Sequence, residues 1–235
     1  MGQHPRPTFT YLGHSAVRCE LPDGNVVLVD PWLTSNPSCP KACKSQDRVD
    51  AVLVTHGHFD HVGDTVELSR RHNPQKVVSN FEICTWLEAH GVTNCAGMNL
   101  GGTQEVLDLQ VTMVRADHSS SLPDGTYGGL AAGFVVKLAG GFTFYHAGDT
   151  ALFSDMQLIA ELYRPELAFL PIGDLFTMDP QQAARACRYL GVRHVIPIHW
   201  GTFPLLTGTP DQLHQGLAAI GASCSLLALK PGESY

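Results

Sequence analysis

Four potential metal ligands lie within six residues of the chain, directly after a short apolar run. His56, His58, Asp60 and His61 follow residues 51–54, which are typical of a buried strand because they are few and rich in β-branched side chains. In an extended backbone His56 and His58 project to the same side, and a following turn can aim Asp60 and His61 at a nearby point. One short segment can therefore supply ligands to two metal ions.

The ligand types narrow the choice of metal. Imidazole and carboxylate groups without a cysteine are typical of zinc, iron and manganese sites. We therefore expect two divalent metal ions as cofactors, with zinc favoured and manganese or iron as alternatives. Histidines are also common on protein surfaces, but three of them at this spacing, with an aspartate and at a strand end, favour a metal site.

A site for two metals needs further ligands, and three candidates occur in similar local settings. Each of them stands just past a predicted strand, and strands that end at one edge of a sheet bring such residues together. They are His118 after residues 111–115, Asp149 after residues 142–146 and His199 after residues 195–198.

The elements that must position these side chains form two β-rich halves, each followed by helices. The patterns predict strands over residues 9–12, 16–21, 26–30, 51–54, 76–79, 103–115 (a hairpin), 132–138, 142–146, 167–170, 194–198 and 225–229, and helices over residues 62–72, 81–90, 151–163, 180–190 and 210–220. This order predicts an α/β (α+β) fold with two sheets face to face and helices outside, a four-layer αββα sandwich. We expect one domain over residues 1–235, with a long loop over residues 31–47.

Composition and charge exclude several classes of partner. The formal charge of −7 and the absence of a lysine and arginine run argue against nucleic acid or an anionic membrane. Residues 1–6 lack the apolar core of a signal peptide, and no apolar segment is long enough to cross a bilayer. We expect a cytoplasmic protein that acts on a small molecule. Its seven cysteines are predicted to be free thiols, although Cys39 and Cys43 could form a redox pair or half of a structural zinc site.

These segments resemble the metallo-β-lactamase superfamily, whose signature is His-x-His-x-Asp-His followed by single His, Asp and His ligands. Tyr-Leu-Gly-His-Ser at residues 11–15, Asp-Pro-Trp-Leu at residues 30–33 and His-Ala-Gly-Asp-Thr at residues 146–150 are similar to its branch of small metal-dependent hydrolases. That branch is similar to the ascorbate-6-phosphate lactonases. The resemblance runs from about residue 8 to about residue 231 and specifies the fold better than the substrate.

The resemblance implies that the ligands divide into two sets around a shared carboxylate. His56, His58 and His118 would hold one metal, Asp60, His61 and His199 would hold the second, and Asp149 would lie between them. A hydroxide that bridges the metals would attack a small ester, lactone or phosphodiester, and Asp60 would orient it or move its proton. No cysteine occupies a ligand position, which argues against β-lactam hydrolysis.

Other residues are candidates for supporting roles. His14, His146 and Trp200 are predicted to face the substrate, Trp32 and Phe203 are candidates for an apolar wall, and Asp30 is the first candidate partner for a ligating imidazole. Members of the superfamily commonly form oligomers, so a homo-oligomer is left open. The competing class is a non-catalytic protein that binds metal for structure or sensing, since a ligand set alone does not prove turnover.

Overall fold

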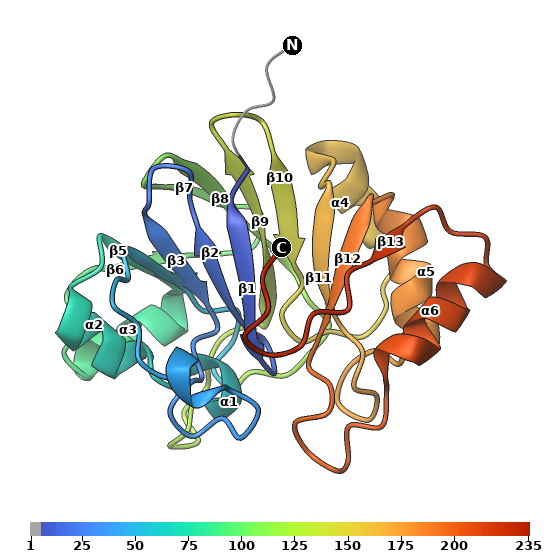
Figure 1. Cartoon of the computed structure of the whole chain (residues 1–235). Helices are drawn as coiled ribbons and strands as arrows, with labels where there is room; N and C mark the ends of the chain where they lie inside the picture. Colours follow the sequence, from blue (N-terminus) through green and yellow to red (C-terminus); the bar gives the residue numbers. More distant parts are fainter. Residues whose placement is uncertain (1–5) are drawn as a thin grey trace.

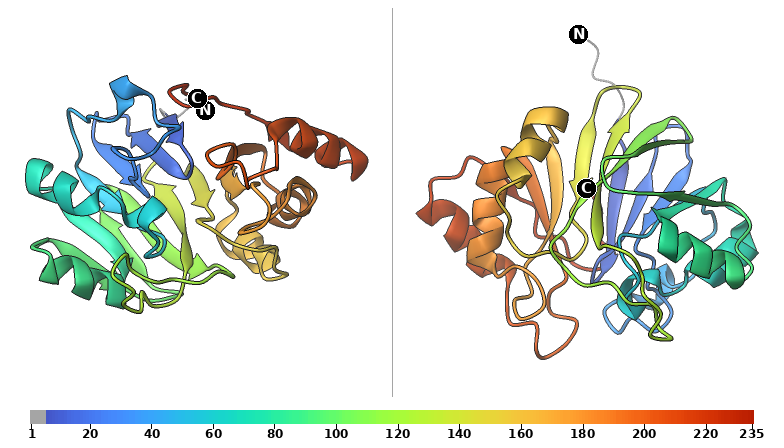
Figure 2. Two further views of the ribbon diagram at one scale, coloured as in Figure 1. Left: turned by 90° about the horizontal axis from the view of Figure 1, so that it is seen from below. Right: turned by 180° about the vertical axis from the view of Figure 1, so that it is seen from behind.

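Two β-sheets face each other, and helices cover their outer faces (Figure 1). This computed structural model describes residues 6–235, so predictions about residues 1–5 lie outside the described part of the chain. The first sheet runs in the order β1-β2-β3-β4-β5-β6 and the second in the order β13-β12-β11-β10-β9-β8-β7. The left panel of Figure 2, seen from below, shows the helices on the outer sides of the two sheets. The predicted αββα sandwich is therefore confirmed.

The strands of the first sheet are β1 (Thr8–Gly13), β2 (Ala16–Glu20), β3 (Val26–Val29), β4 (Ala51–Leu53), β5 (Lys76–Asn80) and β6 (Cys95–Met98). Those of the second are β7 (Thr103–Val106), β8 (Leu109–Arg115), β9 (Ala132–Leu138), β10 (Thr143–His146), β11 (Leu167–Pro171), β12 (His194–Ile198) and β13 (Ser225–Leu226). The α-helices are α1 (Phe59–Val62), α2 (Thr65–His72), α3 (Phe81–Ala89), α4 (Met156–Tyr163), α5 (Pro180–Leu190) and α6 (Pro210–Ala219). A short 3₁₀ turn, Lys41–Cys43, interrupts the predicted long loop.

Apolar side chains from both sheets interdigitate to form the central core. The ring of Phe9 from β1 meets Phe144 of β10 edge-on at a centroid distance of 4.9 Å and Phe169 of β11 at 5.3 Å. Such edge-to-face aromatic pairs stabilise a core beyond the gain from burying their area. The core therefore fixes the first sheet against the second, and with it the relative position of the loops at their edges.

The strand directions place several strand ends at one edge. Strands β10, β11 and β12 are parallel, and β8 points the same way because it is antiparallel to β9, which is antiparallel to β10. The segment just after β4 reaches the same edge, where the carbonyl of Thr55 accepts a hydrogen bond from the first residue of β9, Ala132, at 3.1 Å. The chain that leaves β4, β8, β10 and β12 therefore meets in one region, at the lower edge of Figure 1.

Two predicted helices differ from the structure for local reasons. The helix predicted over residues 62–72 is divided at Gly63, where a β-carbon would lie 2.8 Å from the Cα atom of Trp32. The helix predicted from residue 151 begins only at Met156, and ahead of it the backbone N–H of Ala151 donates to the carbonyl of Asp117 at 3.0 Å. In both places the chain contacts a distant segment, and after Gly63 the N–H of Asp64 donates to the carbonyl of Pro31 at 2.9 Å instead of to a helical carbonyl.

The strand predictions missed one element and extended another. Strand β6 was not predicted, because its Cys-Ala-Gly-Met sequence lacks β-branched residues. The last strand ends at Leu226 and not at residue 229. The chain then crosses to β1, where Phe9 and Tyr235 exchange backbone hydrogen bonds of 2.8 and 2.9 Å.

Over residues 6–235 no helix combines the length and apolarity that a membrane crossing requires.

Candidate metal centre

The loop after β4 positions its candidate ligands through one extended stretch and one helical turn. His58 has an extended backbone and caps α1, so Asp60 and His61 occupy the first turn of that helix. Gly57 sits between the histidines, where a β-carbon would lie 3.0 Å from the carbonyl of Ser121. A glycine is needed there because the loop after β8 presses against this segment.

Three histidines form one group on the side of β4 and β8. The nearest imidazole nitrogens of His56, His58 and His118 all lie within 4.8 Å of one another, and Nε2 of His56 is 3.0 Å from Nδ1 of His58. Burial lowers the pKa of all three imidazoles, and the neighbouring histidines add to this effect. Neutral imidazoles are the form that binds a metal.

A second group lies on the side of α1 and β12. Ligand atoms of His14, Asp60, His61 and His199 lie within 4.8 Å of one another. Nε2 of His199 is 4.0 Å from Oδ2 of Asp60. His199 follows β12 with a positive φ of 54°, a left-handed conformation that few bulky residues adopt and that often marks a functional position. This group offers imidazole and carboxylate donors together.

Asp149 stands between the two groups. Its Oδ2 lies 2.9 Å from Nε2 of His199, 3.3 Å from Nε2 of His61 and 3.7 Å from Nε2 of His118. Burial alone would raise the pKa of Asp149, but the imidazoles of His199 and His61 outweigh it and hold the pKa well below its usual range. The carboxylate is therefore ionised and in reach of both groups.

Two buried atoms without partners indicate that the nitrogens and oxygens of the two groups and of Asp149 fit a metal. Oδ1 of Asp149 and Nε2 of His61 are buried and have no hydrogen-bond partner in the described structure. An orphaned buried polar atom is costly in a protein interior unless something else satisfies it. Divalent cations among these oxygen and nitrogen atoms would supply that partner, and the donors are those that zinc, iron and manganese accept.

Asp30 orients His61 from behind. Its Oδ2 lies 2.8 Å from Nδ1 of His61, and its two oxygens also accept hydrogen bonds from the backbone N–H and the hydroxyl of Thr55, at 2.8 and 2.7 Å. Burial lowers the pKa of His61, but Asp149 and Asp30 outweigh it and raise that pKa well above its usual value. A ligating imidazole typically donates its second nitrogen to a carboxylate in this way. The structure thus brings Asp30 to Nδ1 of His61, while its role beside a ligating imidazole stays a prediction.

His14 orients Asp60 in a similar way. It is fully buried, with Nε2 2.9 Å from Oδ2 of Asp60 and Nδ1 2.9 Å from the hydroxyl of Thr202. Burial, reinforced by His199, lowers the pKa of His14 to about 4, so the imidazole is neutral at pH 7. A neutral His14 that donates from Nε2 must accept at Nδ1, where the hydroxyl of Thr202 is the donor. Burial raises the pKa of Asp60, but the hydrogen bond from His14 and nearby charges lower it to about 2.

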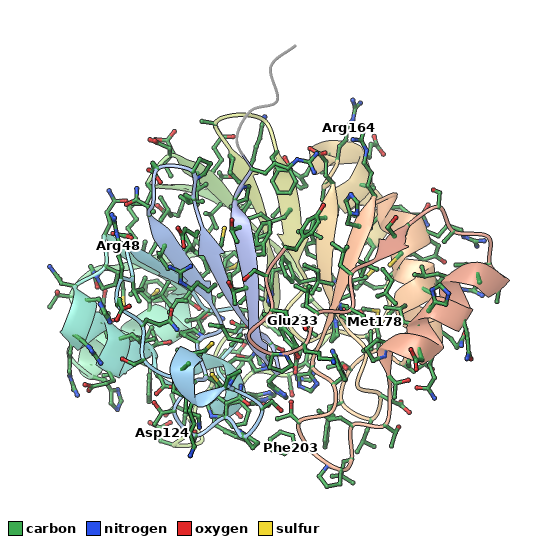
Figure 3. All side chains as sticks on the ribbon, viewed as in Figure 1. Arg48, Asp124, Arg164, Met178, Phe203 and Glu233 are labelled. Carbon is green, nitrogen blue, oxygen red and sulfur yellow. The ribbon has the colours of Figure 1, made fainter. Side chains whose placement is uncertain are left out.

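A cavity of about 460 Å³ opens onto the two groups. It is lined by His58, Phe59, Asp60, His118, Ser119, Asp149, Phe176, His199 and Phe203. Figure 3 shows Phe203 on a loop at the same lower edge as α1. The cavity is the place where a substrate would meet the metal ligands.

The three residues predicted to face the substrate do not line this cavity. His14 is held by Asp60 and Thr202. His146 is buried, with Nε2 3.1 Å from the carbonyl of Ser15, and Trp200 donates to the carbonyl of Pro197 at 3.0 Å while its ring packs on the core. Each of them therefore has a partner inside the protein.

Several residues of the site were not predicted from the sequence. The partners Thr202 and Thr55 were missed, as were Phe59 and Phe176 in the cavity wall. Phe59 could have been found from the sequence, because it is the one large apolar residue within residues 55–61, the ligand loop. Thr202 carried none, since it lies 188 residues from its partner His14 in the sequence.

Comparisons with known proteins show which chains this one resembles. The model of the beta-lactamase superfamily domain matches residues 25–200. A UPF0173 metal-dependent hydrolase of Koribacter versatilis is 50% identical over 229 residues, which cover 96% of each chain. Another of Solibacter usitatus is 50% identical and covers 95% of this chain and 97% of its own. The solved structure of a metallo hydrolase from Ignicoccus hospitalis is 36% identical, with a TM-score of 0.87 and 97% of both chains covered.

Proposed function

This chain belongs to the β-lactamase superfamily, and on that premise we propose that it is a dinuclear metal-dependent hydrolase of small esters, lactones or phosphodiesters. The observation that supports the proposal most strongly is the position of Asp149 Oδ2 within 3.7 Å of histidines from both groups. The names of the relatives also favour an enzyme over a non-catalytic metal-binding or sensing protein.

Each residue has a role in this proposal. His56, His58 and His118 would hold one cation, Asp60, His61 and His199 the other, and Asp149 would contact both. When bound, the cations would supply Lewis acidity and a water acidified enough to act as a nucleophile near neutral pH. Zinc is favoured, with manganese or iron as alternatives.

The protein's own groups prepare the attack. The low pKa of Asp60 keeps its carboxylate ionised near neutral pH, and His14 fixes the orientation of that carboxylate through Oδ2, so that it can hold a cation and orient the attacking water. Asp30 holds His61 through Nδ1, which leaves Nε2 directed at the site. The mouth formed by Phe59, Phe176 and Phe203 would exclude bulk water from one side of the substrate.

The test is hydrolysis by protein of measured metal content. A p-nitrophenyl ester, a lactone and a p-nitrophenyl phosphodiester would be offered to the loaded, the chelated and the reloaded protein. We expect turnover of at least one class, lost on chelation, regained on reloading and abolished in His58→Ala. The matched control is His214→Ala, which removes an exposed histidine of α6. A loaded protein that turns over no class, or a chelated protein of undiminished activity, would overturn the proposal.

A further inference from the structure

Aromatic rings, and no cationic side chains, surround the metal ligands in the cavity. Three of the nine lining residues are phenylalanines, from three separate segments. Phe59 begins α1, Phe176 lies in the loop after β11, and Phe203 lies in the loop after β12. None of the lining residues, all in the described part of the chain, is a lysine or an arginine.

Two of these rings are largely exposed, and all three lie together at one cavity. Phe59 is 56% exposed and Phe176 is 53% exposed, although each stands at the mouth of a cavity. Exposed apolar groups gathered at one place, rather than scattered singly, mark ligand or partner sites. We therefore expect an apolar group of a ligand to cover this wall, formed by Phe59, Phe176 and Phe203.

The wall has a rigid support behind it. Trp32 is only 4% exposed, and the centroid of its ring lies 5.7 Å from the ring centroid of Phe59 and 5.9 Å from that of Phe203. Its indole N–H donates to the hydroxyl of Ser35 at 2.6 Å, which fixes the ring. Phe203 also meets the ring of His14 at 5.6 Å. Trp32 thus supports Phe59 and Phe203, and His14, which also fixes Asp60, contacts Phe203.

The third ring is presented by a strained loop. Asp174 and Leu175, directly before Phe176, both have positive φ, of 66° and 53°. A left-handed conformation is uncommon for a bulky residue such as leucine and persists only where the surroundings enforce it. The N–H of Asp174 donates to the carbonyl of Met178 at 3.1 Å, which closes the loop that carries Phe176 at the cavity mouth.

The absence of lysine and arginine from the described residues that line the cavity limits which substrate groups can bind against this wall. A phosphate or carboxylate on the part of a substrate remote from the metals would need an arginine or lysine partner there, and the cavity offers none. A cavity of about 460 Å³ has the size typical of small-molecule sites. An uncharged alkyl or aryl group would cover the exposed rings and leave no charge unpaired.

We infer that Phe59, Phe176 and Phe203 form a subsite for an apolar acyl group, so that the substrates are carboxylic esters or lactones with an alkyl or aryl chain and without a phosphate. This inference rests on the proposed hydrolase function and narrows its substrate class.

The first experiment measures turnover as the acyl chain grows. We expect kcat/KM for p-nitrophenyl octanoate to exceed that for the acetate by about tenfold or more in the wild-type protein, since each buried methylene of a substrate contributes several-fold. A phosphorylated sugar lactone should be hydrolysed more slowly than an alkyl lactone. Phe176→Ala, which lies outside the ligand loop, and Phe59→Ala should each reduce the octanoate preference by about threefold or more.

The control is Phe81→Ala, which removes a ring that is 67% exposed and does not line the cavity. It should keep the full chain-length preference. Equal kcat/KM for the two esters, or a preference for the phosphorylated lactone, would overturn the inference while leaving the hydrolase function intact.

A binding experiment keeps the inference testable if no ester is turned over. Acetohydroxamic and octanohydroxamic acids, which bind metals through the same group, would be titrated into metal-loaded protein by calorimetry. We expect the longer acid to bind about tenfold or more tightly, and Phe176→Ala to reduce that difference. Equal affinities, or binding of neither acid, would overturn the subsite whatever the catalytic result.

Discussion

Nε2 of His14 lies 2.9 Å from Oδ2 of Asp60, so a fully buried histidine from the turn between β1 and β2 fixes a carboxylate of the ligand loop. His14 has a positive φ of 57°, and its carbonyl accepts a hydrogen bond from the backbone N–H of His199 at 2.7 Å. One residue therefore joins the first sheet, the ligand loop and the loop after β12. Asp60 owes its orientation to this contact.

Removing the hydroxyl of Thr202 should loosen Asp60 without changing a ligand. In Thr202→Val the imidazole of His14 loses the donor that fixes its tautomer, so its hydrogen bond to Asp60 is no longer enforced. We expect kcat to fall by about tenfold, with the KM of the substrate and the content of metal nearly unchanged. Thr207→Val, an exposed threonine in the same loop, serves as control. An unchanged kcat in Thr202→Val would contradict the role of this contact.

The carboxylate of Asp30 should set the affinity of the metal held by His61. Asp30→Asn keeps the shape of the side chain but replaces a charged acceptor with an amide. We expect the affinity for one of the two proposed metals to fall by about 10- to 100-fold, as measured by competition with a metal indicator.

Asp50→Asn is the matched control for Asp30, because Asp50 also accepts a backbone N–H, that of Val26, at 2.7 Å. Asp50 lies outside both ligand groups, so its variant should bind metal like the wild type. Equal metal affinities in the two variants would argue that Asp30 acts on folding alone.

Asp149 should be needed for full metal occupancy. Asp149→Asn removes the charge that Nε2 of His199 and His61 face. We expect the metal content to fall from about two ions per chain to about one or fewer, as measured by inductively coupled plasma mass spectrometry after dialysis. Asp108→Asn, in the exposed turn before β8, should keep the full content. Undiminished content in Asp149→Asn would remove the residue from the ligand set.

Removing the metals should destabilise the fold. Every ion that binds the folded chain and not the unfolded one stabilises the folded state. The stabilisation is about 2.7 kcal/mol when the free ion concentration is one hundred times the dissociation constant. For a chain of this size we expect Tm to fall by about 5 °C or more after chelation, as measured by calorimetry. The same chelator should shift the Tm of Asp149→Asn less. Identical Tm values for loaded and chelated wild type would contradict the expectation.

Gly63 should matter for packing more than the less confined Gly97 does. A β-carbon there would lie 2.8 to 2.9 Å from Trp32, whose ring supports the wall. We expect Gly63→Ala to lower the free energy of unfolding by about 1–3 kcal/mol in urea titrations. Gly97→Ala, where the nearest atom is 3.4 Å away, should cost clearly less. Equal losses would mean that Trp32 yields without strain.

The sequence predicted the parts of the site that depend on local pattern. The strand at residues 51–54 with its histidines, and the strand ends before His118, Asp149 and His199, were readable because each ligand follows its own short apolar run. The sandwich was predictable for the same reason. Strand order and direction then bring these ends to one edge.

What the sequence did not reveal depends on contacts between distant segments. The pairing of His14 with Thr202, the break at Gly63 against Trp32 and the late start of α4 each arise where two remote stretches meet. His146 and Trp200 look like site residues from their neighbours in the chain, but their side chains turn inward to backbone carbonyls. Local pattern carries no information about that choice of direction.

The central claim is that seven side chains hold two metals around Asp149, and anomalous X-ray diffraction at the absorption edge of the bound metal tests it most directly. We predict two peaks, one about 2.0–2.2 Å from nitrogens of His56, His58 and His118 and one at similar distances from His61, His199 and Asp60, both adjoining Asp149. A single peak, or peaks away from Asp149, would contradict the account.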